Sequence, residues 1–63
     1  MGKTKADARE QLTNRGVPLG QNFYSLNWDM KERILEAAKA HGYRKPKNAN
    51  GSTARCFYEY CNR

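Results

Sequence analysis

Glycine and proline divide this 63-residue chain into three segments that can form helices. Gly16 and Pro18 close the first segment, and Gly42 closes the second. Pro46 and Gly51 keep the following residues out of a continuous helix, because proline lacks a backbone donor and glycine favours turns. A chain of this length has room for one small hydrophobic core and no second one. The positions of these residues therefore favour a compact arrangement of short helices.

The expected architecture is a single small all-α domain over residues 1–63, with residues 1–3 disordered. Each expected helix starts beside a residue whose side chain can cap the first backbone N–H groups, namely Thr4, Asn27 and Ser52. We expect three helices near residues 4–15, 28–41 and 53–62, with a long basic loop at residues 43–52.

Apolar residues recur at helical spacing and predict the core. The last helix has a complete stripe at i, i+3, i+4 and i+7, made of Ala54, Phe57, Tyr58 and Cys61. The second helix has a similar stripe, made of Met30, Ile34, Ala37, Ala38 and His41. We expect the aromatic part of the core to contain Trp28, Phe23, Phe57 and Tyr58. We expect an ordered loop over residues 17–26 to bring in Val17, Leu19, Phe23 and Leu26, with a short strand at residues 22–26 as an alternative that has no evident partner.

The positive charge is concentrated in one part of the chain. Twelve Lys and Arg residues against six Asp and Glu residues give a net charge of +6 and a pI near 9.7. Residues 43–55 carry four of the cations and no acid, so +4 of the +6 lies in this segment. Such a charge favours a polyanionic partner, and DNA or RNA is the first hypothesis. The competing interpretation is that the charge serves solubility alone.

The basic segment leads into the start of the last helix, where backbone N–H groups lack internal partners and the helix dipole is positive. The residues gathered there form a candidate phosphate-binding site: Arg44, Lys45, Lys47, Asn50, Gly51, Ser52, Thr53 and Arg55. Alternatively, Ser52 only caps the helix and the loop is simply solvated. About ten residues separate the last two helices, too many for the usual helix-turn-helix motif, so we do not expect sequence-specific reading.

A second candidate surface lies beside the basic loop and is formed by Tyr43, Cys56 and Tyr60. Tyr43 can stack on a base or pack beneath the loop. Cys56 and Tyr60 flank the apolar stripe of the last helix, where exposed groups can form a protein contact or a dimer interface. We therefore expect a monomer or a weak homodimer.

Other functional classes have less support. His41 is the only histidine, and it ends a helix, where a cationic ring suits the helix dipole. We therefore expect a non-enzyme with no metal site and no cofactor. Cys56 and Cys61 lie too far apart along one helix for a disulfide and are expected to be reduced. The chain has no long apolar run and no signal-peptide stretch, so we expect no membrane contact and a cytoplasmic location.

Residues 42–52 (Gly-Tyr-Arg-Lys-Pro-Lys-Asn-Ala-Asn-Gly-Ser) and 54–60 (Ala-Arg-Cys-Phe-Tyr-Glu-Tyr) resemble the C-terminal half of short, basic, uncharacterised bacteriophage proteins. The resemblance covers about a third of the chain. It implies a viral accessory protein that acts in the host cytoplasm, and it makes a host polymerase, nuclease or defence factor an alternative partner. It transfers no catalytic residue and no ligand.

Overall fold

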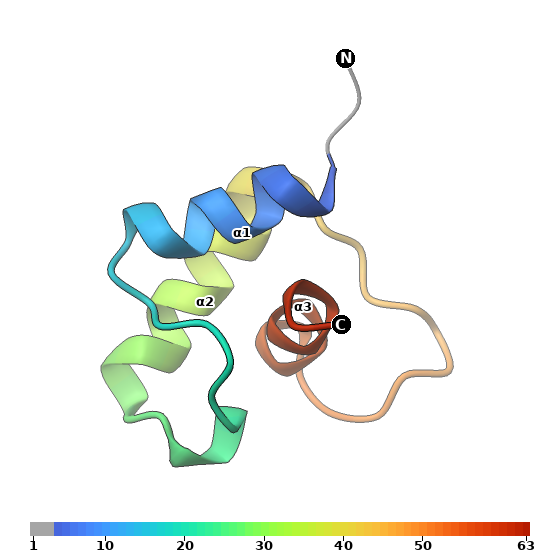
Figure 1. The fold of residues 1–63 in the computed structure, drawn as a ribbon. Helices are drawn as coiled ribbons and strands as arrows, with labels where there is room; N and C mark the ends of the chain where they lie inside the picture. The colour runs from blue at the N-terminus through green and yellow to red at the C-terminus, as the bar shows by residue number, and fades with distance from the viewer. Residues whose placement is uncertain (1–3) are drawn as a thin grey trace.

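The computed structural model describes residues 4–63, which form three α-helices and one short 3-10 helix (Figure 1). The elements are, in chain order, α1 (Lys5–Asn14), η1 (Phe23–Ser25), α2 (Trp28–His41) and α3 (Thr53–Cys61). The predicted all-α class is confirmed, and each predicted helix end lies within one residue of the observed end. The prediction that residues 1–3 are disordered lies outside the described residues.

Side-chain caps and glycines set the helix ends. The predicted caps Thr4, Asn27 and Ser52 each accept a hydrogen bond from the backbone N–H three residues later, at 3.2, 2.9 and 3.2 Å. Gly16 and Gly42 follow α1 and α2 with φ values of 77° and 81°, a region that favours glycine. In each case the N–H of the next residue returns to the carbonyl five residues earlier, as in a Schellman motif. Local chemistry therefore defines these boundaries.

Helix α2 packs against both α1 and α3, and the three helices enclose the core (Figure 1). The largest fully buried side chains come from all three helices: Tyr58, Phe57, Leu12, Ile34 and Cys61. The remaining buried apolar residues are Ala8, Val17, Phe23, Ala37, Ala38 and Ala54. The predicted stripe of α3 is thus buried at every position, and the predicted stripe of α2 is buried except at Met30, which is half-buried.

Two core predictions were wrong. Trp28 is 72% exposed because it is the first residue of α2 and lies off that helix's buried stripe. Leu19 is 37% exposed, while Val17, two residues earlier, is buried. The rest of this segment behaves as expected, since Phe23 is buried and Leu26 packs against the core. It does so through η1, a single 3-10 turn, and not as a plain loop.

His41 is buried at the end of α2, as expected, and makes a further contact there. It is only 6% exposed, and its Nδ1 atom lies 2.7 Å from a carboxylate oxygen of Asp7. Its ring also lies 5.6 Å from that of Phe57, measured between centroids. His41 therefore joins the end of α2 to the first turn of α1, in addition to lying at the negative end of the α2 dipole.

The carboxyl end of α3 is held by cations from α1. Arg9 donates from Nε to the carbonyl of Cys61 at 2.7 Å, and Lys5 donates from Nζ to the carbonyl of Arg63 at 3.2 Å. The last carbonyls of a helix lack internal partners and carry partial negative charge, so cations stabilise them. Two of the positive charges in the N-terminal part of the chain therefore have a structural role.

Candidate nucleic-acid interface

The basic loop, residues 43–52, joins α2 to α3 and arches away from the helices (Figure 1). Arg44, Lys45 and Lys47 are all exposed, and none of them makes a hydrogen bond or ion pair within residues 4–63. A turn closed by the N–H of Ala49 and the carbonyl of Pro46, 3.1 Å apart, shapes the tip. Three uncompensated cations are therefore presented to solvent within four residues of sequence.

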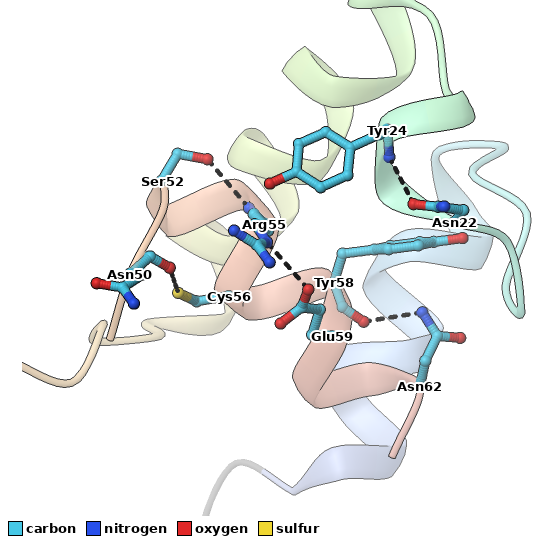
Figure 2. Close-up of polar contacts among 9 residues, drawn as sticks. All are labelled: Asn22, Tyr24, Asn50, Ser52, Arg55, Cys56, Tyr58, Glu59 and Asn62. Atoms are coloured by element: carbon cyan, nitrogen blue, oxygen red, sulfur yellow. Dashed lines mark hydrogen bonds and ion pairs between the residues drawn. The ribbon is translucent and has the colours of Figure 1, made fainter. Parts of the chain in front are cut away.

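The base of this loop is anchored on α3. The half-buried ring of Tyr43 lies 5.3 Å from that of Phe57 and 5.7 Å from that of Tyr60. Burial, assisted by the neighbouring Cys56, raises the pKa of the Tyr43 phenol above its ordinary value. Near the other end of the loop, Cys56 donates from Sγ to the carbonyl of Asn50 at 3.6 Å (Figure 2). The loop is therefore attached at both ends while its cations remain exposed.

A hollow of about 260 Å³ lies between this loop and α3, and we call it the loop hollow. It is lined by Tyr43, Pro46, Ala49, Asn50, Arg55, Cys56, Glu59 and Arg63. Its wall carries the cations Arg55 and Arg63 and the acid Glu59, so it is polar and weakly positive.

The start of α3 is a capped helix N-terminus, as the sequence predicts. Ser52 is the N-cap residue, and its Oγ accepts a hydrogen bond from the N–H of Arg55 at 3.2 Å. The N–H groups of Thr53 and Ala54 donate no hydrogen bond to any described residue. Gly51 precedes the cap with a φ of 92°, where a side chain is strained. The first turn of α3 therefore offers two backbone donors beside a polar loop.

Arg55 is already engaged within the protein. Its Nε donates to Glu59 at 3.0 Å, and its guanidinium carbon lies 5.1 Å from the centre of the Tyr24 ring (Figure 2). The hydrogen bond with Glu59, followed by the interaction with Tyr24, raises the pKa of Arg55. A Cβ at Gly51 would lie 2.9 Å from the Arg55 Cδ, so glycine allows the loop to approach this side chain. Glu59 thus compensates part of the Arg55 charge.

The structure separates the predicted phosphate-contact residues into two groups. Arg44, Lys45 and Lys47 are exposed on the loop. The other five lie at or beside the α3 cap: Asn50, Gly51, Ser52, Thr53 and Arg55, of which Asn50 and Arg55 line the loop hollow. The predicted protein-contact residues, Tyr43, Cys56 and Tyr60, are each half-buried. Tyr60 is covered in part by Tyr43 and by Lys5, whose Nζ lies 5.6 Å from the centre of its ring. Their roles in binding stay predictions.

Two exposed aromatic residues were missed by sequence reasoning. Tyr24 and Trp28 are 63% and 72% exposed, and both lie near the start of α3. Trp28 borders a second hollow of about 280 Å³, which we call the Trp28 hollow and which is lined by Phe23, Trp28, Lys31, Glu32, Leu35, Ser52 and Ala54. The sequence did carry a signal, because Trp28 directly follows the cap Asn27 and does not share the spacing of the buried stripe of α2.

Within residues 4–63, no cluster of three or more His, Cys, Asp or Glu side chains is arranged to hold a metal ion. None of the helices in this part of the chain is long and apolar enough to span a membrane. No protein-family model matches the chain, and no curated protein or solved structure shows significant similarity to it.

Proposed function

We propose that this protein binds nucleic acid through phosphate contacts made by the basic loop and the start of α3. The observation that carries the proposal is the exposure of Arg44, Lys45 and Lys47, which have no acidic partner among the described residues. Elsewhere, Arg9 and Arg55 are held by carbonyls or by a carboxylate. Exposed, closely spaced cations favour release of counterions from a polyanion, which drives such binding.

The backbone at the start of α3 supports the same proposal. The N–H groups of Thr53 and Ala54 lie next to the loop, and an anion there is favoured by the dipole of α3. Ala54 is only 7% exposed, so Thr53 is the more accessible of the two donors. Phosphates recognised in this way position the ligand without reading its sequence. We therefore propose binding without sequence preference.

The proposal is of a binding protein and not of an enzyme. The only histidine, His41, is buried, and its Nδ1 atom is occupied by Asp7. Cys61 is fully buried, and burial raises the pKa of its thiol to about 11, which disfavours the reactive thiolate. These two groups are therefore poorly suited to acid–base or nucleophilic roles.

Binding of the purified protein to labelled DNA and RNA over a series of salt concentrations tests the proposal. We expect the triple variant R44A/K45A/K47A to weaken binding and to reduce the slope of log K against log salt by about 2 to 3, since three phosphate contacts are lost. The matched control removes three cations elsewhere, in the variant R15A/R33A/K39A, and should retain most of the affinity. Absence of binding to single strands and duplexes at about 50 mM salt would exclude the proposed function.

An alternative function is binding of a host protein, in keeping with the resemblance to bacteriophage proteins. The exposed Trp28 and Tyr24 side chains favour this alternative, because large exposed aromatic groups are enriched in protein interfaces. A pull-down from bacterial lysate, with and without nuclease, distinguishes the two functions. A stoichiometric protein that remains bound after nuclease treatment favours the alternative, whereas loss of all partners with nuclease favours nucleic acid.

A further inference from the structure

The two most exposed large hydrophobic side chains of the described chain, Tyr24 and Trp28, both lie around the first turn of α3. Trp28 borders the Trp28 hollow together with Ser52 and Ala54, and Tyr24 lies against Arg55 (Figure 2). Scattered exposed hydrophobic residues need no explanation, but an exposed aromatic side chain beside a hollow is a common feature of binding surfaces. The position of Trp28 therefore favours a role in binding.

The Trp28 hollow has the size and lining of a site for a single ring. Its volume of about 280 Å³ lies just below the range of about 300–1,000 Å³ that is typical of sites for drug-sized ligands. Phe23, Leu35 and Ala54 give it apolar walls, while Lys31 and Ser52 supply polar groups. A flat group with an apolar face and polar edges matches this lining.

Charge complementarity identifies the class of ligand. The Trp28 hollow is lined by one cation, Lys31, and one acid, Glu32, so the formal charges of its lining residues cancel. The adjoining basic loop, in contrast, carries three exposed cations without partners in the described chain. Ser52 ends that loop and also lines the hollow, so the loop leads from its three cations to the edge of the hollow. Neutral flat rings joined by negative charges fit both surfaces, and single-stranded nucleic acid has this chemistry.

We propose that Trp28 is a stacking platform for an unpaired base, and that the protein therefore prefers single strands to duplexes. This inference rests on the proposed nucleic-acid binding and adds the class of substrate. Every base has a π-face, so stacking on an aromatic side chain is tolerant of sequence, whereas the bases of a duplex are already stacked on one another. The phosphates on either side of the stacked base then lie toward the start of α3 and the basic loop.

The sole tryptophan of the chain makes the test direct. An oligothymidylate strand should change the fluorescence of Trp28, and a duplex with the same number of phosphates should change it much less. The variant W28A should weaken binding to the strand by about 5- to 150-fold, the range that corresponds to loss of one stacked base. Its affinity for the duplex should stay within about twofold of the wild-type value, because the basic loop is intact.

A strand that contains abasic sites completes the experiment. The wild-type protein should bind the abasic strand about as weakly as W28A binds oligothymidylate. W28A should bind the two strands with equal affinity. The variant W28F, which keeps a ring, should recover part of the affinity, and L19A, which truncates an exposed leucine elsewhere, should bind normally. Trp28 is exposed, so neither substitution at this position removes core packing.

The outcomes separate this inference from the proposed function. If R44A/K45A/K47A loses affinity while W28A binds the strand within about twofold of wild type, phosphate binding stands and the stacking role is overturned. If no nucleic acid binds, both proposals fail. If a protein partner changes the fluorescence of Trp28 while W28A leaves strand affinity unchanged, the hollow is a protein contact and the stacking role is again overturned.

Discussion

Single side chains decide what each surface of this protein can do. Asn27 caps α2, and the next residue, Trp28, is carried into solvent because the buried stripe of the helix starts later, at Met30 and Ile34. Arg55, in contrast, is expected from the sequence to contact a ligand, but its side chain is already bound to Glu59. Burial and neighbours, more than residue type, therefore separate the side chains that are free to bind from those that stabilise the fold.

The two cysteines should differ sharply in reactivity. Cys61 is fully buried, and burial raises the pKa of its thiol from 9.0 to about 11, whereas Cys56 is half-buried at the edge of the loop hollow. Because the thiolate is the reactive form, we expect a disulfide reagent at about pH 8 to label one thiol in the native protein and two after denaturation. Labelling of C56S, which should be absent until the protein unfolds, identifies the reactive group. Rapid labelling of native C56S would contradict this assignment.

At the scale of the elements, each helix depends on groups from another part of the chain. Arg9 in α1 binds the end of α3, and Asp7 in α1 binds His41 at the end of α2. The shortest α-helix, α3, has only nine residues and would be marginal in isolation. Its caps at both ends, Ser52 from its own sequence and Arg9 from α1, therefore determine how well the start of α3 is held for binding.

Loss of the Arg9 contact should destabilise the protein. The Arg9 side chain donates to the carbonyls of Cys61 and Arg63 at 2.7 and 3.3 Å, and R9A leaves both without this charged donor. We expect a decrease of about 1–2 kcal/mol in the free energy of unfolding, measured by urea denaturation. The variant R33A removes the same charge from an exposed site, where Arg33 donates to the Arg15 carbonyl over a longer distance of 3.5 Å. Equal stability of R9A and R33A would show that the α1–α3 contact contributes little.

The whole molecule has a small core and little stability in reserve. Its principal extents are 32 × 28 × 19 Å, and the aromatic residues Phe57 and Tyr58 of α3 supply its two largest fully buried side chains. A domain of this length is expected to have a free energy of unfolding of about 3–9 kcal/mol. The segment between α1 and α2 is held on this core by the buried Val17 and Phe23 and by hydrogen bonds to residues of α3 and its C-cap. The Asn62 side chain accepts from the N–H of Gly20, and the Tyr58 hydroxyl donates to the carbonyl of Pro18 and accepts from the N–H of Gln21.

Removal of that hydroxyl should therefore affect the whole domain. The variant Y58F keeps the buried ring but leaves the Pro18 carbonyl and the Gln21 N–H without their partner. We expect a loss of about 1–2 kcal/mol and a lower melting temperature in far-UV circular dichroism, with the cooperative transition retained. Tyr24 is exposed and its hydroxyl makes no hydrogen bond within residues 4–63, so Y24F serves as the control. A melting temperature for Y58F equal to that of Y24F would contradict the role assigned to this phenol.

The sequence alone determined the helices and the position of the basic loop. Caps such as Asn27 and Ser52, and the terminating glycines Gly16 and Gly42, act on backbone groups a few residues away, so their effects can be read from local order. The loop cations Arg44, Lys45 and Lys47 were predictable for the same reason, because no acid lies near them in the chain.

Only the tertiary structure decided which side chains face solvent and which are already bound. The pairing of Asp7 with His41, of Arg9 with the end of α3, and of Tyr58 with the segment after α1 joins residues at least 34 positions apart. The Trp28 hollow likewise forms where α2 and α3 meet. Such contacts depend on how helices pack in three dimensions, and helical periodicity describes each helix without saying where its neighbours lie.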